Sequence, residues 1–254
     1  MNRLTEVMPD GTHRAVTRAW VSEVPVAFEF NGLAYAVMMA TPTDLEDFCI
    51  GFALSEGLAA GIGDIAVAEV EHGWIVRATL SGLGIDQLTE RVRTRVAESS
   101  CGLCGIENLA AVAKPLPQVA PHVALDPSAI FAALAALRPL QVLGNATGAA
   151  HAAAHVSAEG AIACLREDVG RHNALDKLVG ALARDGHPLT PGFVLSTARC
   201  SYEIVEKAVR GGATTLVCVS LPTSLAVERA KAAGLSLWAL ARDDSVLLVN
   251  DASR

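Results

Sequence analysis

The sequence lacks the features that would suit a membrane or a nucleic acid. Its longest strongly apolar run, residues 129–137, is far too short to span a bilayer. Residues 1–6 contain no apolar region of the kind that a signal peptide carries. The formal net charge of -7 excludes the broadly basic surface that general nucleic-acid binding requires. We therefore expect no membrane and no nucleic-acid partner, although a local basic pocket for a small anion remains compatible with this charge.

The six cysteines do not form the spacing pattern of a disulfide framework. Only Cys101 and Cys104 form a Cys-x-x-Cys pair, and no second such pair exists. Unpaired cysteine spacing, together with the missing signal peptide, indicates a reducing cytoplasm. The other cysteines stand alone, mostly inside apolar runs where cysteine behaves as a small hydrophobic residue; they are Cys49, Cys164, Cys200 and Cys218.

The Cys101–Cys104 pair lies in a stretch that favours sulfur chemistry. A glycine follows each cysteine, so both thiols are expected on a loop that can change its position. Residues 106–112 can begin a short helix. Because the N-terminus of a helix favours the thiolate, such a helix would lower the pKa of a nearby thiol. The pattern indicates a reactive sulfur site.

Three other interpretations of this pair stay open at this point. A closed structural zinc site needs four ligands, so the missing two would come from distant residues or from a second chain. A thioredoxin-like redox motif opens a helix after the first strand of a βαβ unit, whereas this pair comes late, between two segments. The two cysteines can also be ordinary surface residues. The pair alone favours a reactive sulfur and a metal site about equally.

The N-terminal part reads as α+β. Hydrophobic residues make up 52% of the 254 residues, which is enough to fill the cores of two modest domains. Asn31-Gly32 between two apolar runs predicts a hairpin over 24–39. Thr43 and Glu46 form a capping-box pattern at the start of a helix that Gly57 can end. The remaining predictions are a loose start over 1–19, a hairpin over 65–80 that turns at His72-Gly73, and a helix over 85–96 that leads into the two-cysteine loop.

The C-terminal part alternates strands with helices. Prolines at 115 and 117 break regular structure, so we divide the chain into an N-terminal α+β domain, 1–115, and a C-terminal α/β domain, 116–254. Asp126 and Pro127 are suited to start a helix over 128–137. A hairpin (150–156, 161–166) follows, and then helix 171–184, strand 193–197, helix 201–210, strand 214–220, helix 223–233 and strand 235–241. Such alternation predicts a mostly parallel sheet covered by helices.

Polar residues follow the strands of this predicted sheet, where ligands bind in α/β proteins. In helix 171–184, an apolar stripe through Leu175 and Leu178 is expected to be buried, and four polar residues are expected on the remaining surface: His172, Asn173, Asp176 and Lys177. Helix N-termini beside basic side chains can hold a phosphate or pyrophosphate; the basic candidates are Arg166, Arg171, Lys177 and Arg199. Capping is the better interpretation for Ser201, Thr223 and Ser224, and His151 taken alone suits a structural role.

Four stretches, taken in order, match a known family. They are Cys-Gly-Leu-Cys-Gly (101–105), Arg-Glu-Asp-Val-Gly-Arg-His-Asn-Ala-Leu-Asp-Lys (166–177), Ser-Tyr-Glu-Ile-Val-Glu-Lys-Ala (201–208) and Pro-Thr-Ser-Leu-Ala (222–226). With these the chain closely resembles the formate dehydrogenase accessory sulfurtransferase family. The match runs over most of the length and is strongest from residue 99 onward. The 166–177 stretch is very specific, whereas Cys-x-x-Cys alone would be weak.

The resemblance implies a cytoplasmic maturation factor, a homodimer, whose C-terminal domain is αβα-layered and similar to the cytidine deaminase fold. It implies a sulfurtransferase that receives sulfur from a cysteine desulfurase as a cysteine persulfide. The sulfur then passes to the molybdenum (or tungsten) cofactor, a bis-molybdopterin guanine dinucleotide bound as substrate, before the cofactor enters the catalytic subunit of formate dehydrogenase. A guanine nucleotide is expected to mimic this cofactor, and no permanent cofactor or metal is expected.

Site residues follow position by position from this resemblance. Cys101 and Cys104 match the sulfur-carrying motif, and the 166–177 stretch is assigned to the cofactor pocket through Arg166, Arg171, His172, Asn173, Asp176 and Lys177. The neighbouring loops add His151, Arg199 and Ser220. The chain departs from the family pattern at Ala149 and Ala198, where a glycine is usual, and the added Cβ atoms can change nucleotide contacts there.

Deaminase chemistry is not expected despite the implied fold. Zinc deaminases need His-x-Glu and, downstream of it, Pro-Cys-x-x-Cys. Here His151 is followed by two alanines, and the cysteine pair precedes that histidine. Two rival functions stay open: a chaperone that binds the molybdenum cofactor without sulfur chemistry, and a zinc-bridged dimer with a structural role.

Overall fold

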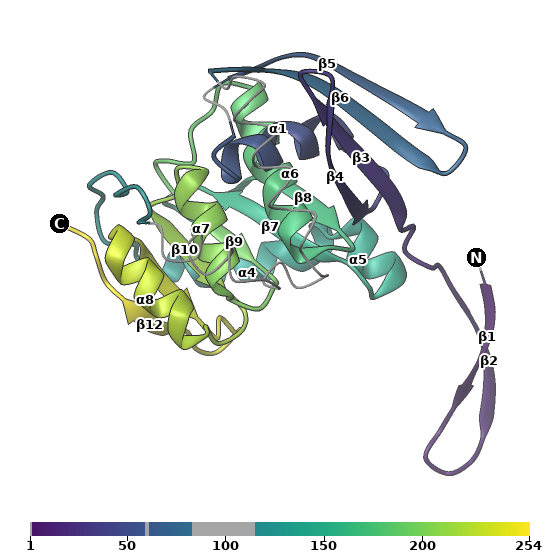
Figure 1. The fold of residues 1–254 in the computed structure, drawn as a ribbon. Coiled ribbons are helices and arrows are strands. Elements are labelled where there is room, and N and C mark those ends of the chain that lie inside the picture. The colour runs from purple at the N-terminus through teal and green to yellow at the C-terminus, as the bar shows by residue number, and fades with distance from the viewer. Residues whose placement is uncertain (1, 59–60, 83–114) are drawn as a thin grey trace.

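The computed structural model describes residues 2–58, 61–82 and 115–254. Within these residues the chain forms three sheets: a two-stranded ribbon, a four-stranded sheet and a six-stranded sheet (Figure 1). Helices cover the two larger sheets, so the fold is mixed α/β. In the part of the chain that is described, no helix is both long and apolar enough to cross a membrane.

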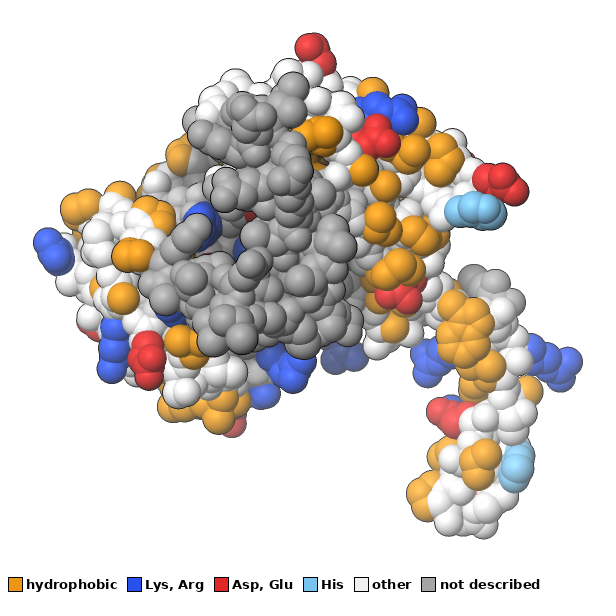
Figure 2. Space-filling model, viewed as in Figure 1, with side chains coloured by type: hydrophobic (Ala, Val, Ile, Leu, Met, Phe, Trp, Pro, Cys, Tyr) orange, Lys and Arg blue, Asp and Glu red, His pale blue; other side chains and the backbone are white. Residues whose placement is uncertain are grey.

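The first residues form a ribbon, and the predicted loose start is wrong. Strands β1 (Asn2–Val7) and β2 (His13–Arg18) pair antiparallel along their whole length. Gly11, with φ 82°, and the Asp10 carboxylate, which accepts the Thr12 N–H, close the turn between them. The ribbon stands clear of the rest of the molecule (Figure 2).

The four-stranded sheet has the order β4-β3-β6-β5. Strands β3 (Val24–Phe30) and β4 (Leu33–Ala40) form the predicted hairpin, and Asn31 and Gly32 both have positive φ, as a tight two-residue turn requires. The second predicted hairpin is also confirmed. It consists of β5 (Gly61–Val70) and β6 (Gly73–Ser81), which pair antiparallel.

Helix α1 (Leu45–Ser55) packs on this sheet, and its aromatic residues form the centre of the N-terminal core. The rings of Phe28 and Phe48 meet edge to face at 4.9 Å. The predicted capping box is wrong, since the N-cap is Asp44 in a left-handed conformation and no side chain caps the helix. Gly57, with φ 63°, ends the helix as predicted, because its N–H binds the Leu54 carbonyl.

The six-stranded sheet has the order β12-β11-β10-β9-β7-β8. Its strands are β7 (His151–Val156), β8 (Ile162–Asp168), β9 (Phe193–Ser196), β10 (Thr215–Cys218), β11 (Ser236–Ala239) and β12 (Leu247–Asn250). Only β9, β10 and β11 run parallel. These three strands alternate with helices and are parallel as predicted, and β7 and β8 form the predicted hairpin. The sheet as a whole is not mostly parallel, because β7 pairs antiparallel with β9 and the unpredicted β12 pairs antiparallel with β11.

Helices cover both faces of this sheet, as the predicted αβα layering requires (Figure 1). One face carries α6 (Arg171–Arg184), α7 (Tyr202–Arg210) and α8 (Ser224–Ala233), and the bounds of α6 are those predicted. The other face carries α4 (Pro127–Leu140), which Asp126 caps as predicted. The short α5 (Val142–Thr147) was not predicted. The likeness to the cytidine deaminase fold stays a prediction.

The N-terminal and C-terminal parts meet where α1 packs against α6. A Cβ atom at Gly51 of α1 would lie 1.6 Å from the Asp176 carbonyl oxygen, and one at Gly180 of α6 would lie 1.8 Å from the Asp47 carbonyl oxygen. The two helix backbones are therefore in direct contact, which only glycine at both positions permits. The hydrophobic cluster of residues 26–80 is separate from the two clusters that lie within 116–241. The domain boundary near 115 stays a prediction.

Candidate functional site: a basic cluster at one edge of the sheet

The polar loops lie together at one end of the strands of the six-stranded sheet, and we call this end of the strands the edge of the site. The parallel strands β9, β10 and β11 all end there. Because β7 is antiparallel to β9, His151 at the start of β7 lies at the same edge, and Asp168 at the end of β8 is paired with it. Ligands bind at this edge in open α/β sheets. The loops after β8, β9 and β10 therefore carry their side chains to one place.

Four of the predicted site residues come together at this end of the sheet, and we call them the basic cluster: His151, Arg171, His172 and Arg199. Burial lowers the pKa of His151, and the charges of Arg171, Arg199 and His172 lower it further, while Asp168 opposes them. Arg199 is exposed and the other three are half-buried. A group of this kind attracts anions.

Glu203, a residue that the sequence analysis did not select, contacts the basic cluster. It projects from the first turn of α7, where its Oε2 lies 3.2 Å from His172 Nε2 and 3.9 Å from Arg171 Nη2. Burial raises the pKa of Glu203, but His172 and Arg171 outweigh burial and hold this pKa below its usual value of 4.5. Glu203 is therefore the anionic counterpart of these two side chains.

Two buried side-chain nitrogens of the cluster have no hydrogen-bond partner among the described residues. They are Arg171 Nε and His172 Nε2. The approach of Glu203 to His172 is thus close enough for an ion pair but poorly directed for a hydrogen bond. Buried N–H groups in folded proteins are normally paired. An anion with several oxygens is the kind of ligand that would satisfy both.

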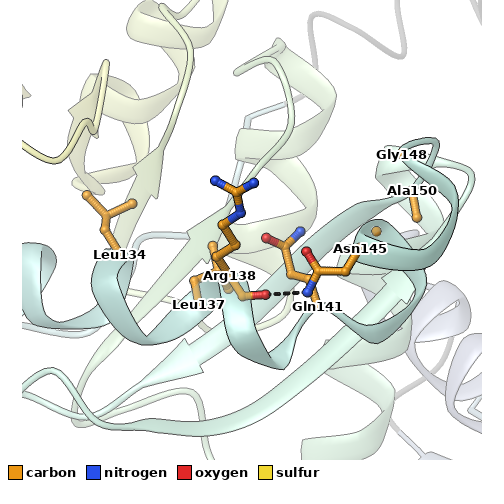
Figure 3. Close-up of a pocket in the computed structure, with 8 residues that line it drawn as sticks. Leu134, Leu137, Arg138, Gln141, Asn145, Gly148 and Ala150 are labelled. Atoms are coloured by element: carbon orange, nitrogen blue, oxygen red, sulfur yellow. Dashed lines mark hydrogen bonds between the residues drawn. The ribbon is translucent and has the colours of Figure 1, made fainter. Parts of the chain in front are cut away.

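A cavity of about 260 Å³ adjoins this edge, between α4, α5 and the residue before His151. Arg138, Gln141 and Asn145 line one part of it, and the Asn145 amide donates to the Arg138 carbonyl (Figure 3). Ala150, which forms the cavity wall, directly precedes His151. At this volume, which is below the roughly 300–1,000 Å³ of ligand pockets, the cavity has room for only a part of a ligand.

The comparisons with known proteins decide the family. Residues 21–254 match the sequence model of the FdhD/NarQ family. The chain belongs to this family. The "Sulfur carrier protein FdhD" of Variovorax paradoxus is 46% identical over 235 residues, which is 91% of this chain and 84% of that protein. The protein of the same name from Cupriavidus necator is 45% identical over 223 residues, covering 87% of this chain and 77% of that protein.

A solved structure shares the fold. The crystal structure of a candidate formate dehydrogenase accessory protein from Desulfotalea psychrophila has a TM-score of 0.74 to this chain. The alignment covers 98% of this chain and 96% of the other, at 23% identity. At this identity the likeness concerns the fold alone.

The motif that carries most of the family resemblance, 166–177, divides between two locations. Arg171 and His172 lie in the basic cluster, but Asn173, Asp176 and Lys177 are buried and directed toward the N-terminal part. Asn173 Nδ2 donates to the Met39 carbonyl, and Lys177 Nζ donates to the Thr41 carbonyl, both at 2.9 Å. The expectation that these side chains lie on the helix surface is wrong, because α1 covers that side of α6.

Asp176 is part of a second buried group. Its carboxylate accepts from Ser55 Oγ at 2.6 Å and pairs with Lys207 Nζ at 2.9 Å. Burial would lower the pKa of Lys207, but Asp176 and Glu56 outweigh burial and raise it. This ion pair joins α1, α6 and α7. Its position away from solvent indicates a role in fixing the N-terminal part behind the site rather than in contacting a ligand.

Arg166 and Ser220 complete the predicted set of binding residues. Arg166 Nε donates to Asp47 Oδ2 of α1 at 2.9 Å, so this side chain also joins the two parts of the chain. Ser220 is half-buried in the loop after β10, at the edge of the sheet where the basic cluster lies, and its carbonyl accepts from the Leu240 N–H. Ser220 thus stays a candidate by position, and Arg166 is already paired with protein.

Four of the six cysteines lie in the part of the chain that the structure describes. Cys101 and Cys104 lie outside the described residues. The interpretation of Cys49, Cys200 and Cys218 as core residues is confirmed, since all three are buried; burial raises the pKa of the Cys49 thiol to about 12. Cys164 is half-buried beside Arg166. Among the described residues, no group of three or more His, Cys, Asp and Glu is arranged to hold a metal ion.

Both departures from the family's usual glycines lie near the site. Ala149 is exposed before His151, and its N–H donates to Thr147 Oγ1. Ala198 is buried before Arg199, and its N–H donates to Ser196 Oγ. Both positions are close in sequence to members of the basic cluster, and the effect of their methyl groups on ligand contacts stays a prediction.

Proposed function

We propose that this protein is the sulfur carrier of formate dehydrogenase maturation. It accepts sulfur from a cysteine desulfurase as a persulfide and transfers it to the molybdenum cofactor, a bis-molybdopterin guanine dinucleotide. Relatives named sulfur carriers, which match about nine-tenths of the chain, support the sulfur chemistry. The observation that carries the cofactor half of the proposal is the basic cluster, because His151, Arg171, His172 and Arg199 suit the pyrophosphate groups of such a dinucleotide.

Sulfur loading is a nucleophilic exchange at the Cys101–Cys104 pair. The thiolate of one cysteine attacks the terminal sulfur of the donor persulfide. A new S–S bond forms to that sulfur, the donor S–S bond breaks, and the donor leaves as a thiolate. No net oxidation accompanies this step, because the donor persulfide is exchanged for a persulfide on this chain.

Delivery follows by one of two routes. The loaded cysteine can give its terminal sulfur directly to the bound cofactor: the S–S bond of the persulfide then breaks, the cysteine leaves as a thiolate, and the reduced cofactor would have to supply the two electrons that bring the sulfur to the sulfide level. Alternatively, the second thiol attacks the sulfur of the loaded cysteine, its electron pair releases the terminal sulfur as sulfide, and the two cysteines remain as a disulfide. In the second route the two thiols supply both electrons. The cysteine that is loaded first is left open.

The basic cluster would hold the cofactor while this happens. Arg171 and Arg199 would pair with phosphate oxygens, and the half-buried imidazoles of His151 and His172 would donate to the same groups. A part of the cofactor would extend from the cluster toward the adjoining cavity. The proposal includes a homodimer and delivery to the catalytic subunit of formate dehydrogenase.

The test is maturation of formate dehydrogenase in cells that lack the native gene for this protein. The Cys101→Ala/Cys104→Ala double variant should give inactive formate dehydrogenase although it folds and still binds a guanine nucleoside diphosphate. The matched control is Cys164→Ala, which removes a half-buried cysteine outside the motif and should leave maturation intact. Normal maturation with the double variant would favour a cofactor chaperone without sulfur chemistry and would contradict the sulfur carrier.

A further inference from the structure

A carboxylate inside an anion site needs an explanation. Glu203 stays ionised at neutral pH, since its pKa is lowered, and it lies at ion-pair distance from His172 and Arg171. A phosphate bound at the same side chains would be repelled by this charge. Glu203 therefore opposes ligand binding unless it performs another task there.

The basic cluster needs a group that counters the repulsion between its own side chains. Burial is the first cause of the lowered pKa of His151, and the charges of Arg171, Arg199 and His172 lower it further, so these side chains repel one another. Arg171 and His172 are adjacent in sequence in the first turn of α6, whereas Glu203 comes from α7. One Glu203 oxygen lies near both, which holds the two side chains on the same side of the first turn.

Glu203 does not serve mainly as a cap of its own helix. The N-cap of α7 is Ser201, whose side chain makes no capping hydrogen bond. Ser201 Oγ instead donates to Glu203 Oε2 at 3.4 Å, which is the oxygen that faces His172. The local arrangement thus fixes the carboxylate toward α6.

We propose that Glu203 is a positioning residue for the anion site. It holds Arg171 and His172 in the orientation that a phosphate or pyrophosphate group uses, and this gain outweighs the repulsion that its charge causes. The inference rests on the proposed function, since it concerns the same site. It differs from a purely structural role because the two effects of the carboxylate respond differently to salt.

The experiment compares wild type with Glu203→Gln by calorimetric titration with inorganic pyrophosphate. Glutamine keeps the length of the side chain and removes its charge. At roughly 0.4 M KCl the Debye length is about 5 Å, so the repulsion between Glu203 and a phosphate bound beyond His172 and Arg171 is screened more than the 3.2 Å contact of Glu203 with His172, and loss of positioning dominates. We expect binding about tenfold weaker there, with a smaller deficit at low salt, where the removed repulsion offsets part of the loss.

The matched control is Glu206→Gln. Glu206 lies on the same helix but pairs with Arg229 of α8, away from the cluster. This variant should bind pyrophosphate as wild type does at every salt concentration. In the ligand-free protein, the ring signals of His172 in NMR spectra should change in Glu203→Gln and stay unchanged in Glu206→Gln.

The outcomes separate this inference from the proposed function. If wild type binds pyrophosphate and Arg199→Ala weakens binding, but Glu203→Gln binds equally or more tightly at high salt, the positioning role is wrong and the anion site stands. If wild type does not bind pyrophosphate at all, the anion site fails and the positioning role fails with it. An affinity deficit of Glu203→Gln that grows with salt concentration supports both the anion site and the positioning role of Glu203.

Discussion

Lys177 Nζ lies 2.6 Å from Asp168 Oδ2, and both side chains are completely buried. Asp168 also accepts from the backbone N–H groups of Thr41 and Gly170. Gly170 is the N-cap of α6, directly before Arg171 and His172. This ion pair therefore connects the end of β4 in the N-terminal part with the helix turn that carries half of the basic cluster.

Replacing Lys177 by methionine should strongly destabilise the protein. Methionine has a similar volume but leaves the Asp168 carboxylate as a buried charge without its partner. Removing one partner of such a pair costs about 3–5 kcal/mol of the free energy of unfolding. Urea unfolding measures this, with the exposed Lys231→Met of α8 as control, which should stay within about 0.5 kcal/mol of wild type. Equal effects of the two variants would contradict the assigned role.

Gly51→Ala should weaken the contact between α1 and α6. The added methyl group would lie 1.6 Å from the Asp176 carbonyl oxygen, so α1 has to move away from α6. Overpacking of this kind costs about 1–3 kcal/mol of the free energy of unfolding. Gly63→Ala is the matched control, since nothing lies within 4 Å of the place that its added methyl group would take. A thermal unfolding midpoint lowered only in Gly51→Ala is the expected result, and an unchanged midpoint would show that the helix contact is not tight.

Acid should remove the stabilising effect of Glu203. Its folded pKa is lower than the unfolded value of 4.5, so the unfolded chain binds the proton more readily. The stabilisation is then complete above about pH 4.5 and is lost as the pH falls through the lower folded pKa. Urea unfolding between about pH 6 and pH 3 should show that the difference in free energy of unfolding between wild type and Glu203→Gln becomes smaller as the pH falls. A difference that is constant with pH would contradict the ion-pair assignment.

Binding of pyrophosphate should be linked to proton uptake by His151. Burial and its cationic neighbours hold the pKa of ligand-free His151 below 6.5. A bound anion raises this pKa, so binding takes up a proton and affinity rises as the pH falls through the pKa of the bound state. Pyrophosphate titrations at a series of pH values around 6.5 and below, in identical buffers, should show affinity rising as the pH falls in wild type and rising less in His151→Gln. The same pH dependence in both proteins would exclude His151 from the site.

Local signals in the sequence determined much of the fold. Asn31-Gly32 predicts its hairpin because few residues adopt the positive φ values that the turn needs. Helix 171–184 was predicted with its observed bounds from one apolar stripe. The capping box at Thr43 failed because the Thr43 N–H binds the Thr41 carbonyl, a turn that depends on contacts distant in sequence. The antiparallel pairings of β7 with β9 and of β11 with β12 were not predicted, because they too join segments that are distant in sequence or that lack a local signal.

The site was predicted in part, and the error has a clear cause. The polar side of helix 171–184 was expected to face solvent, because nothing within the helix shows that α1 covers it. The available signal was a pair of glycines, Gly51 and Gly180, inside two predicted helices. Glycine inside a helix costs stability and often marks close packing. Recognising it would have assigned Asp176 and Lys177 to the contact between helices.

Mass spectrometry of the 101–104 peptide tests the central claim most directly. The full-length protein is incubated with a cysteine desulfurase and free cysteine, then digested without reductant. The account predicts that this peptide gains the mass of one sulfur atom, that a thiol reductant reverses the gain, and that Cys101→Ala/Cys104→Ala abolishes it. A wild-type peptide that gains no sulfur under these conditions would contradict the account.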